Sequence, residues 1–278
     1  LAFLNKDGSD SMFGEPPEWG AAIVLSLWAA YRYSGERRLL EDGYESMCRY
    51  ARYLDGRRLE DGMLDHGLGD WYDIGPKPVG EAQLTSRKLT GTCTYFQLLT
   101  TLATIAATLG KDGEASRWNA RAAEIKQIVN TKLFDAGRNI YDRGSMTALA
   151  MPLAMGIVPE DRRDPVLANL IADIRGHGDH VTAGDVGFHY VVRALMDNGR
   201  GDVLQDILTR TDSPSYGAQL ERGATALTEA WDANPTKSQN HFMLGHAETW
   251  FYAGLAGLRV DLSRQGPARI GIAPQIVP

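Results

Sequence analysis

The sequence predicts an all-α fold built from helical hairpins. Helical periodicity dominates the chain, and strand signals are sparse before its last stretch. Leu98, Leu102, Ile105 and Leu109 recur at intervals of three and four residues, and Gly110 then provides a stop. Because the hairpins show no fixed repeat length, a closed toroid fits them better than an open solenoid.

The same periodicity predicts about ten helices, joined in pairs. Short turns at 34–36 and 110–112 connect the partners of a hairpin, and longer polar loops at 55–86 and 135–144 connect one hairpin to the next. Loops can present polar groups without disrupting packed helices, so we expect the chemistry to lie in them. The predicted helices span residues 17–34, 36–54, 87–109, 112–134, 145–156, 160–175, 185–198, 200–210, 221–231 and 239–257.

Composition limits the classes of partner. The 278 residues are 44% hydrophobic, which is enough for one large core, and the net charge of −6 comes from acidic and basic residues mixed along the chain. No basic stripe points to nucleic acid or to an anionic membrane. No motif indicates a metal or a cofactor, and Cys48 and Cys93 are interpreted as small buried hydrophobic residues.

The two ends of the chain resemble the interior of a longer polypeptide. Residue 1 is Leu, and residues 1–14 look like the middle of a loop. Residues 266–278 look like the start of a strand, with Ile270 and Ile272 alternating before Pro274. We therefore expect the rest of the same polypeptide to be a partner of this chain, and we make no prediction about its compartment.

Five clusters near predicted helix starts combine acids, tryptophan and histidine. Carbohydrate sites need this mixture, because aromatic faces stack on sugar rings while carboxylates and amides bind hydroxyls. A pair of carboxyl groups flanking a glycosidic bond then supplies the acid and the base for its cleavage. The clusters are Glu15-Pro-Pro-Glu18-Trp19-Gly20, Gly67-Leu-Gly-Asp70-Trp71-Tyr72-Asp73, His180-Val-Thr-Ala-Gly184-Asp185, Arg222 to Asp232, and Asn240-His241-Phe-Met-Leu-Gly245-His246.

Each cluster also has a purely structural interpretation. Trp19 opens a predicted helix and would serve as a hydrophobic staple, and Asp70 and Asp73 would serve as turn or cap residues. Asp185 follows a glycine and is an equally good candidate for a helix N-cap. His241, like the other histidines of these clusters, would be a core residue with its hydrogen bonds satisfied. The co-occurrence of all five clusters in one chain favours a site.

Glu229 is the most informative acid. It lies on the apolar face of a predicted helix with Ala224, Leu227 and Trp231, where a carboxylate is unfavourable unless it is paired or functional. A salt bridge to Arg222 would give it a structural role. We favour a catalytic role, because the same segment also offers polar and aromatic groups that suit a sugar.

In their order along the chain, these residues resemble bacterial α-L-rhamnosidases of glycoside hydrolase family 78. The series Glu-Trp-Gly, Gly-Asp-Trp, Thr-Ala-Gly-Asp, Arg-Gly-Ala-Thr-x-x-x-Glu-x-Trp and Asn-His-x-x-x-Gly runs from about Glu15 to Gly257. The resemblance implies an (α/α)6 barrel of twelve helices and an inverting mechanism in which Glu229 is the general base. It also implies that Trp19, Trp71 and His241 line a rhamnose subsite.

Four more cluster residues complete the predicted sugar site: Glu18, Asp70, Asp185 and Trp231. The chain also departs from the family pattern in two places. Thr228 stands where the family usually has Trp before the base. The Asp-Cys-Pro-x-Arg segment that carries the general acid of the family is absent, and it would precede Leu1.

These departures predict the domain organisation. Residues 1–262 would form a barrel lacking its N-terminal hairpin, with about ten of the twelve helices, and residues 263–278 would begin a C-terminal β-domain. The predicted function is release of terminal α-L-rhamnose. Two alternatives remain at this stage: another six-hairpin glycosidase acting on a glucoside or an unsaturated uronide, for which Arg210, Arg222 and Lys237 offer cations, and a non-catalytic helical domain that binds carbohydrate.

Overall fold

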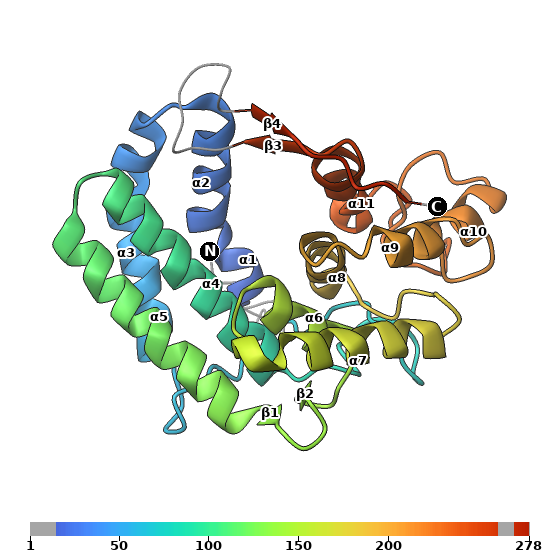
Figure 1. The fold of residues 1–278 in the computed structure, drawn as a ribbon, viewed down its shortest axis with the longest axis horizontal. Coiled ribbons are helices and arrows are strands. Elements are labelled where there is room, and N and C mark those ends of the chain that lie inside the picture. Colours follow the sequence, from blue (N-terminus) through green and yellow to red (C-terminus); the bar gives the residue numbers. More distant parts are fainter. Residues whose placement is uncertain (1–14, 261–269, 278) are drawn as a thin grey trace. The chain divides into compact units, whose positions relative to one another are not determined.

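The computed structural model describes residues 15–260 and 270–277, and these residues are mostly helical, as the sequence predicts (Figure 1). They divide into two compact units, which we describe one at a time. The expectations for residues 1–14 and for the domain boundary after residue 262 lie outside the described residues. No helix among the described residues is long and apolar enough to cross a membrane.

The first unit comprises residues 15–69 and 86–135 and consists almost entirely of helical hairpins. Gly35 and Gly110 turn the chain between hairpin partners with φ angles of 74° and 76°, in the left-handed region that glycine adopts freely. Both predicted hairpin turns are thereby confirmed. The elements are α1 (Pro17–Gly20), α2 (Ala22–Ser34), α3 (Arg38–Gly56), α4 (Arg87–Thr108), α5 (Asp112–Lys132) and the short β1 (Phe134–Asp135).

Helix α4 forms the core of this unit. Ser86 caps its first turn by accepting a hydrogen bond from the Leu89 N–H, and Leu98, Leu102 and Ile105 are fully buried. The helix packs against α1, α2, α3 and α5, so it is covered on several sides. The apolar spacing read from the sequence therefore corresponds to a buried helical face. Cys48 and Cys93 are both free and buried, as predicted.

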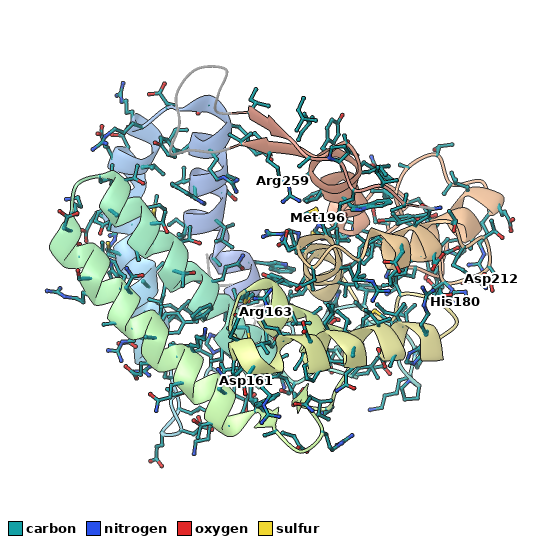
Figure 2. All side chains as sticks on the ribbon, in the orientation of Figure 1. Asp161, Arg163, His180, Met196, Asp212 and Arg259 are labelled. Carbon is teal, nitrogen blue, oxygen red and sulfur yellow. The ribbon has the colours of Figure 1, made fainter. Side chains whose placement is uncertain are left out.

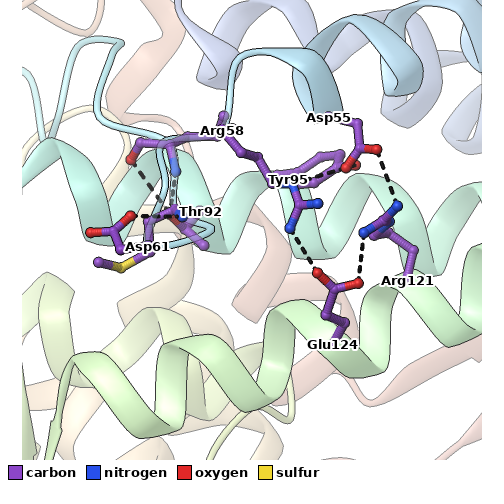
Figure 3. Close-up of polar contacts among 9 residues, drawn as sticks. Asp55, Arg58, Asp61, Thr92, Tyr95, Arg121 and Glu124 are labelled. Atoms are coloured by element: carbon purple, nitrogen blue, oxygen red, sulfur yellow. Dashed lines mark hydrogen bonds and ion pairs between the residues drawn. The ribbon is translucent and has the colours of Figure 1, made fainter.

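An ion-pair network joins α3, α4 and α5 (Figure 3). Arg58 contacts Asp55 at 2.9 Å and Glu124 at 2.8 Å, and Arg121 contacts the same two carboxylates at 3.2 Å and 2.6 Å. The Tyr95 hydroxyl donates to Asp55 at 3.1 Å. Each partly exposed pair stabilises the fold only modestly, but the shared partners fix the register of three helices.

The described residues of the second unit are 70–85, 136–260 and 270–277. Its hairpin partners α6 and α7 pack together, as do α8 and α9, and α8 also packs against α6. The elements are β2 (Ile140–Tyr141), α6 (Met146–Ala154), η1 (Glu160–Arg162), α7 (Arg163–Gly176), α8 (Gly187–Asp197), α9 (Gly201–Leu208), α10 (Tyr216–Glu221), η2 (Phe242–Leu244), α11 (Ala247–Thr249), the π-helical turn η3 (Trp250–Leu255), β3 (Leu258–Val260) and β4 (Ile270–Ile272).

Two predicted helices are wrong in this unit. The helix predicted over 221–231 does not form. Helix α10 ends at Glu221, and residues 222–241 form a loop. Gly223 follows with a φ of 85°, which terminates the helix. The helix predicted over 239–257 is broken into η2, α11 and η3. None of them includes residues 239–241, because His241 is extended and its N–H donates to the Leu227 carbonyl at 2.8 Å.

The C-terminal segment confirms the predicted strand. β4 pairs antiparallel with β3, with Ile270 opposite Val260. Gln275 then packs on the unit: its N–H donates to the Gly254 carbonyl at 2.9 Å, and its side chain donates to the Met196 carbonyl at 2.6 Å. Whether this strand begins a β-domain stays a prediction.

Candidate active site

The predicted site residues fall in both units. Glu18 and Trp19 lie on α1 in the first unit, and the other six lie in the second unit. All six of the latter are in loops or at element boundaries, as expected for groups that carry chemistry. They are Asp70, Trp71, Asp185, Glu229, Trp231 and His241.

In the first unit, Glu18 has a buried carboxyl group. Its Oε2 accepts a hydrogen bond from the Leu68 N–H at 3.3 Å, while its Oε1 is buried without a partner. Burial, partly offset by hydrogen bonds, raises the pKa of Glu18 to about 7. Gly67 has a φ of 115° and lies against this carboxylate. A β-carbon at this position would collide with Glu18 Oε2, so glycine is required here. The neighbouring Trp19 is 42% exposed, which does not fit the staple interpretation.

In the second unit, Asp70 is an anchor. It is 1% exposed, and its carboxylate accepts hydrogen bonds from the N–H groups of Gly184 at 2.9 Å and Gly187 at 2.7 Å. The Thr147 hydroxyl donates a third. Burial raises the pKa of Asp70 to about 6, against the lowering effect of these three bonds. Asp70 therefore joins its own loop to α6 and to the start of α8.

Segment 182–185 lies against the loop that contains Trp71. The Ile74 N–H donates to the Thr182 carbonyl at 2.9 Å, and the Asp185 N–H donates to the Trp71 carbonyl at 2.7 Å. A β-carbon on Gly184 would collide with the Trp71 carbonyl, so glycine is required for this approach. The Thr-Ala-Gly-Asp sequence thus forms one wall that fixes the main chain of Trp71.

Glu229 lies in the loop after α10 and is half-buried. Its N–H donates to the Ser238 carbonyl at 2.9 Å, and its Oε2 accepts from the Ser238 N–H at 2.9 Å. No described residue donates to Oε1 or forms an ion pair with this carboxylate. Arg222, the partner in the structural alternative, instead donates to the Asp232 carbonyl. The carboxylate is therefore oriented at one oxygen and open at the other.

Trp231 connects the Glu229 loop to segment 182–185. Its indole N–H donates to the Ala183 carbonyl at 2.9 Å, and its ring lies edge-on to Phe188 and Tyr216 at centroid distances of 5.0 Å and 5.1 Å. Because Trp231 is only 1% exposed, this ring packs inside the unit and leaves no face for a sugar. Trp231, which was predicted to contact the sugar, is therefore better placed to hold the Glu229 loop.

Asp185 is buried and does not cap a helix. The residue is 5% exposed, its Oδ1 has no hydrogen-bond partner, and α8 begins after Val186 without a side-chain cap. The N-cap interpretation is therefore wrong. Burial, with the nearby carboxylates of Asp70 and Glu229, raises the pKa of Asp185 to about 8.

Histidines occupy three kinds of position. His180 contacts Asp212 at 3.2 Å (Figure 2). His189 and His246 lie 5.0 Å apart between ring centroids, and burial lowers the pKa of both, that of His189 to about 3. Both pack inside the unit, but the Nε2 of His246 is buried with no hydrogen-bond partner among the described residues, so the interpretation as a core histidine with satisfied hydrogen bonds does not hold for His246. His241 is half-buried, and its Nδ1 has no partner.

Three partners in this site were not identified from the sequence. Thr147, Ser238 and the Ala183 carbonyl each hold a predicted residue. Thr147 and Ser238 belong to none of the recognised motifs, and Ala183 belongs to one without having been assigned a role. Asp70 and Thr147 are 77 positions apart, and Trp231 and Ala183 are 48 apart, so no local pattern connects them. Within the described residues, no group of three or more His, Cys, Asp or Glu side chains is arranged so that it could hold a metal ion.

Comparison with known proteins assigns the fold. The family of bacterial α-L-rhamnosidase six-hairpin glycosidase domains matches residues 8–255 of this sequence. The chain belongs to this family. The hairpins of both units and the order of the site loops therefore belong to a six-hairpin glycosidase domain, as the sequence motifs predicted.

Individual relatives agree with this assignment. An α-L-rhamnosidase from Alteromonas sp. is 25% identical over 273 residues, covering 93% of this chain and 29% of the relative. The structure of an α-L-rhamnosidase from Dictyoglumus thermophilum superposes with a TM-score of 0.83 at 30% identity, covering 89% of this chain and 28% of that one. A Streptomyces avermitilis α-L-rhamnosidase complexed with L-rhamnose gives a TM-score of 0.82 at 26% identity, covering 92% and 25%. The chain thus spans less than a third of these relatives.

Proposed function

We propose that this six-hairpin domain belongs to an enzyme that hydrolyses terminal α-L-rhamnosides with inversion, and that Glu229 is its general base. The observation that carries the proposal is the state of the Glu229 carboxylate. One oxygen is held by the Ser238 N–H, and the other has no partner among the described residues. Lys237 interacts with its charge from a distance, but no described cation forms an ion pair with it, so the carboxylate is placed to accept a proton.

In the proposed reaction, a water molecule sits between Glu229 Oε1 and the anomeric carbon. Glu229 removes a proton from this water as its oxygen bonds to the anomeric carbon and the glycosidic C–O bond breaks. The water attacks the face opposite the leaving group, so the configuration at that carbon inverts. In inverting glycosidases, the base and the acid that protonates the leaving oxygen stand about 6.5–9.5 Å apart. We assign that acid to no described residue.

The remaining predicted residues have two proposed roles: some bind the sugar, and others position the residues that do the chemistry. In the second unit, Trp71 and His241 keep the sugar-binding role expected from the sequence. The roles expected of Glu18 and Trp19 stay predictions. Asp70 and Trp231 are buried and hydrogen-bonded, which favours a positioning role for both. Asp70 fixes the loop of Trp71, and Trp231 fixes the loop of Glu229. A base held by its neighbours within a few tenths of an ångström is a condition for efficient proton removal.

The stereochemistry of the product tests this mechanism. Hydrolysis of an aryl α-L-rhamnoside by the full-length protein would be followed by proton NMR during the first minutes, before the free sugar mutarotates. We expect β-L-rhamnose to form first. Initial formation of α-L-rhamnose would mean retention, and Glu229 would then be a nucleophile or an uninvolved carboxylate.

A further inference from the structure

Asp185 is a buried carboxyl group with unsatisfied hydrogen-bonding capacity. Only 5% of the residue is exposed, its Oδ1 is buried without a partner, and it caps no helix. Among the described residues, a carboxylate in this position would lose its hydration without gaining a hydrogen bond on Oδ1 or a counter-ion, which is strongly unfavourable. The side chain therefore needs an explanation beyond packing.

Its surroundings place Asp185 between two other acids. On one side, its N–H is bonded to the Trp71 carbonyl, next to Asp70. On the other side, the bond from Trp231 to Ala183 holds the Glu229 loop against the same segment. The charged groups of the second unit that act on it are Asp70 and Glu229, and both are acidic. His246 lies beside the main chain of Asp185, and burial lowers the pKa of this histidine, which disfavours a positive charge there.

The three carboxyl groups differ in how well each can carry a negative charge. Asp70 receives three hydrogen bonds, from Gly184, Gly187 and Thr147. Glu229 receives one, from Ser238, and is half-exposed to solvent. Asp185 receives none on its buried oxygen. When neighbouring acids compete for a proton, it resides on the group whose ionised form is least stabilised.

We propose that Asp185 is the proton-holding member of a three-carboxyl cluster with Asp70 and Glu229, a positioning residue that stays a neutral carboxylic acid while Glu229 carries the charge. Its proton prevents a second buried charge from forming beside the base. The meaning for catalysis rests on the proposed function of Glu229, but the protonation itself does not. The raised pKa of Asp185 agrees with this arrangement.

The test compares the wild type with Asp185→Asn in the full-length protein. Asparagine is nearly isosteric with a neutral aspartic acid and cannot ionise. The local opening constant of residues 187–197 would be measured by hydrogen exchange from pH 5 to pH 9, corrected for intrinsic exchange rates. Folded Asp185 keeps a proton that the opened chain releases above about pH 4. The wild type should therefore lose local stability relative to the variant as the pH rises.

We expect the opening constant of the wild type, divided by that of Asp185→Asn, to grow roughly tenfold per pH unit up to about pH 8 and then to level off. In a Glu229→Gln background the levelling should move to lower pH, because one of the two neighbouring charges is gone. Asp197→Asn, which removes an ion-paired carboxylate from the same helix, should leave the wild-type pH dependence unchanged. A ratio that stays flat from pH 5 to pH 8, or a levelling point indifferent to Glu229→Gln, would overturn the proposal.

A second measurement covers the case in which Asp185→Asn does not fold. Infrared difference spectra of the unmodified protein, labelled with carbon-13 at aspartate side chains, would follow the protonated carboxyl band between pH 6 and pH 9. We expect an isotope-shifted band that disappears near pH 8. Absence of such a band would contradict the proposal. Neither measurement uses substrate, so a failure of the rhamnosidase assignment would leave both results interpretable.

Discussion

Replacing Glu229 with glutamine should lower kcat for an α-L-rhamnoside by about 10²- to 10⁴-fold, the contribution typical of a positioned general base. Glutamine keeps the shape of the side chain and can still accept a hydrogen bond from the Ser238 N–H, but it cannot take a proton from water. We therefore expect KM and the melting temperature to change little. Steady-state hydrolysis of an aryl rhamnoside and a thermal melt of the same samples measure the three quantities.

The matched control is Glu221→Gln. Glu221 is an exposed glutamate at the end of α10, eight positions before the proposed base in the chain, and it carries no role in the site. The control should keep wild-type kcat. Should Glu229→Gln retain more than about a tenth of the wild-type kcat, the assignment of the base would be wrong, because a general base contributes at least about 10²-fold.

Asp70→Ala should produce the largest loss of stability of any single change in the site. The substitution removes the acceptor for two main-chain N–H groups and one hydroxyl, all buried, and each unsatisfied donor costs about 1–3 kcal/mol. We expect the free energy of unfolding to fall by about 3 kcal/mol or more, enough to threaten a fold of ordinary stability. Denaturation monitored by circular dichroism measures this loss.

A glycine substitution tests the hydrogen bonds to Asp70 from the donor side, and a second glycine substitution serves as its control. A β-carbon on Gly187 would collide with the Thr147 hydroxyl and the Asp70 carboxylate, so Gly187→Ala should destabilise the protein. Gly113→Ala is the control: Gly113 lies in α5 with no atom within 4 Å of the added carbon, so it should be neutral or stabilising by up to about 1 kcal/mol. Equal melting temperatures for the two variants would contradict the anchoring role of Asp70.

The hairpins were predictable because their signals are local. The apolar spacing from Leu98 to Leu109 and the glycine that follows specify α4 and its end without reference to the rest of the chain. The same holds for the turn at Gly35, where a left-handed residue is required. Elements whose hydrophobic period and end signals agree can be read from the sequence alone.

The loop that contains Glu229 was misread because its spacing imitates a helix. Ala224, Leu227 and Trp231 recur at intervals of three and four residues, yet long-range bonds decide their conformation. Trp231 donates to Ala183, and Leu227 accepts from the His241 N–H. Tertiary contacts of this kind override local propensity.

Some of the contacts among the predicted site residues follow from the sequence motifs, and others do not. The acids and tryptophans that stood out in the sequence do gather around segment 182–185 in the second unit. Which of them are buried depends on partners such as Thr147 and Ser238, which no motif marks. Sequence alone therefore pointed to Trp231 as a sugar contact, whereas its burial points to a supporting position.

Release of dinitrophenol tests most directly whether this domain belongs to an enzyme that cleaves rhamnosides. The initial rate with dinitrophenyl α-L-rhamnoside would be compared with that of the matching glucoside, using the same protein. Dinitrophenolate leaves with little help from a general acid, so the rate depends mainly on sugar binding and on the base. We predict turnover of the rhamnoside and none of the glucoside. Turnover of the glucoside alone would contradict the account.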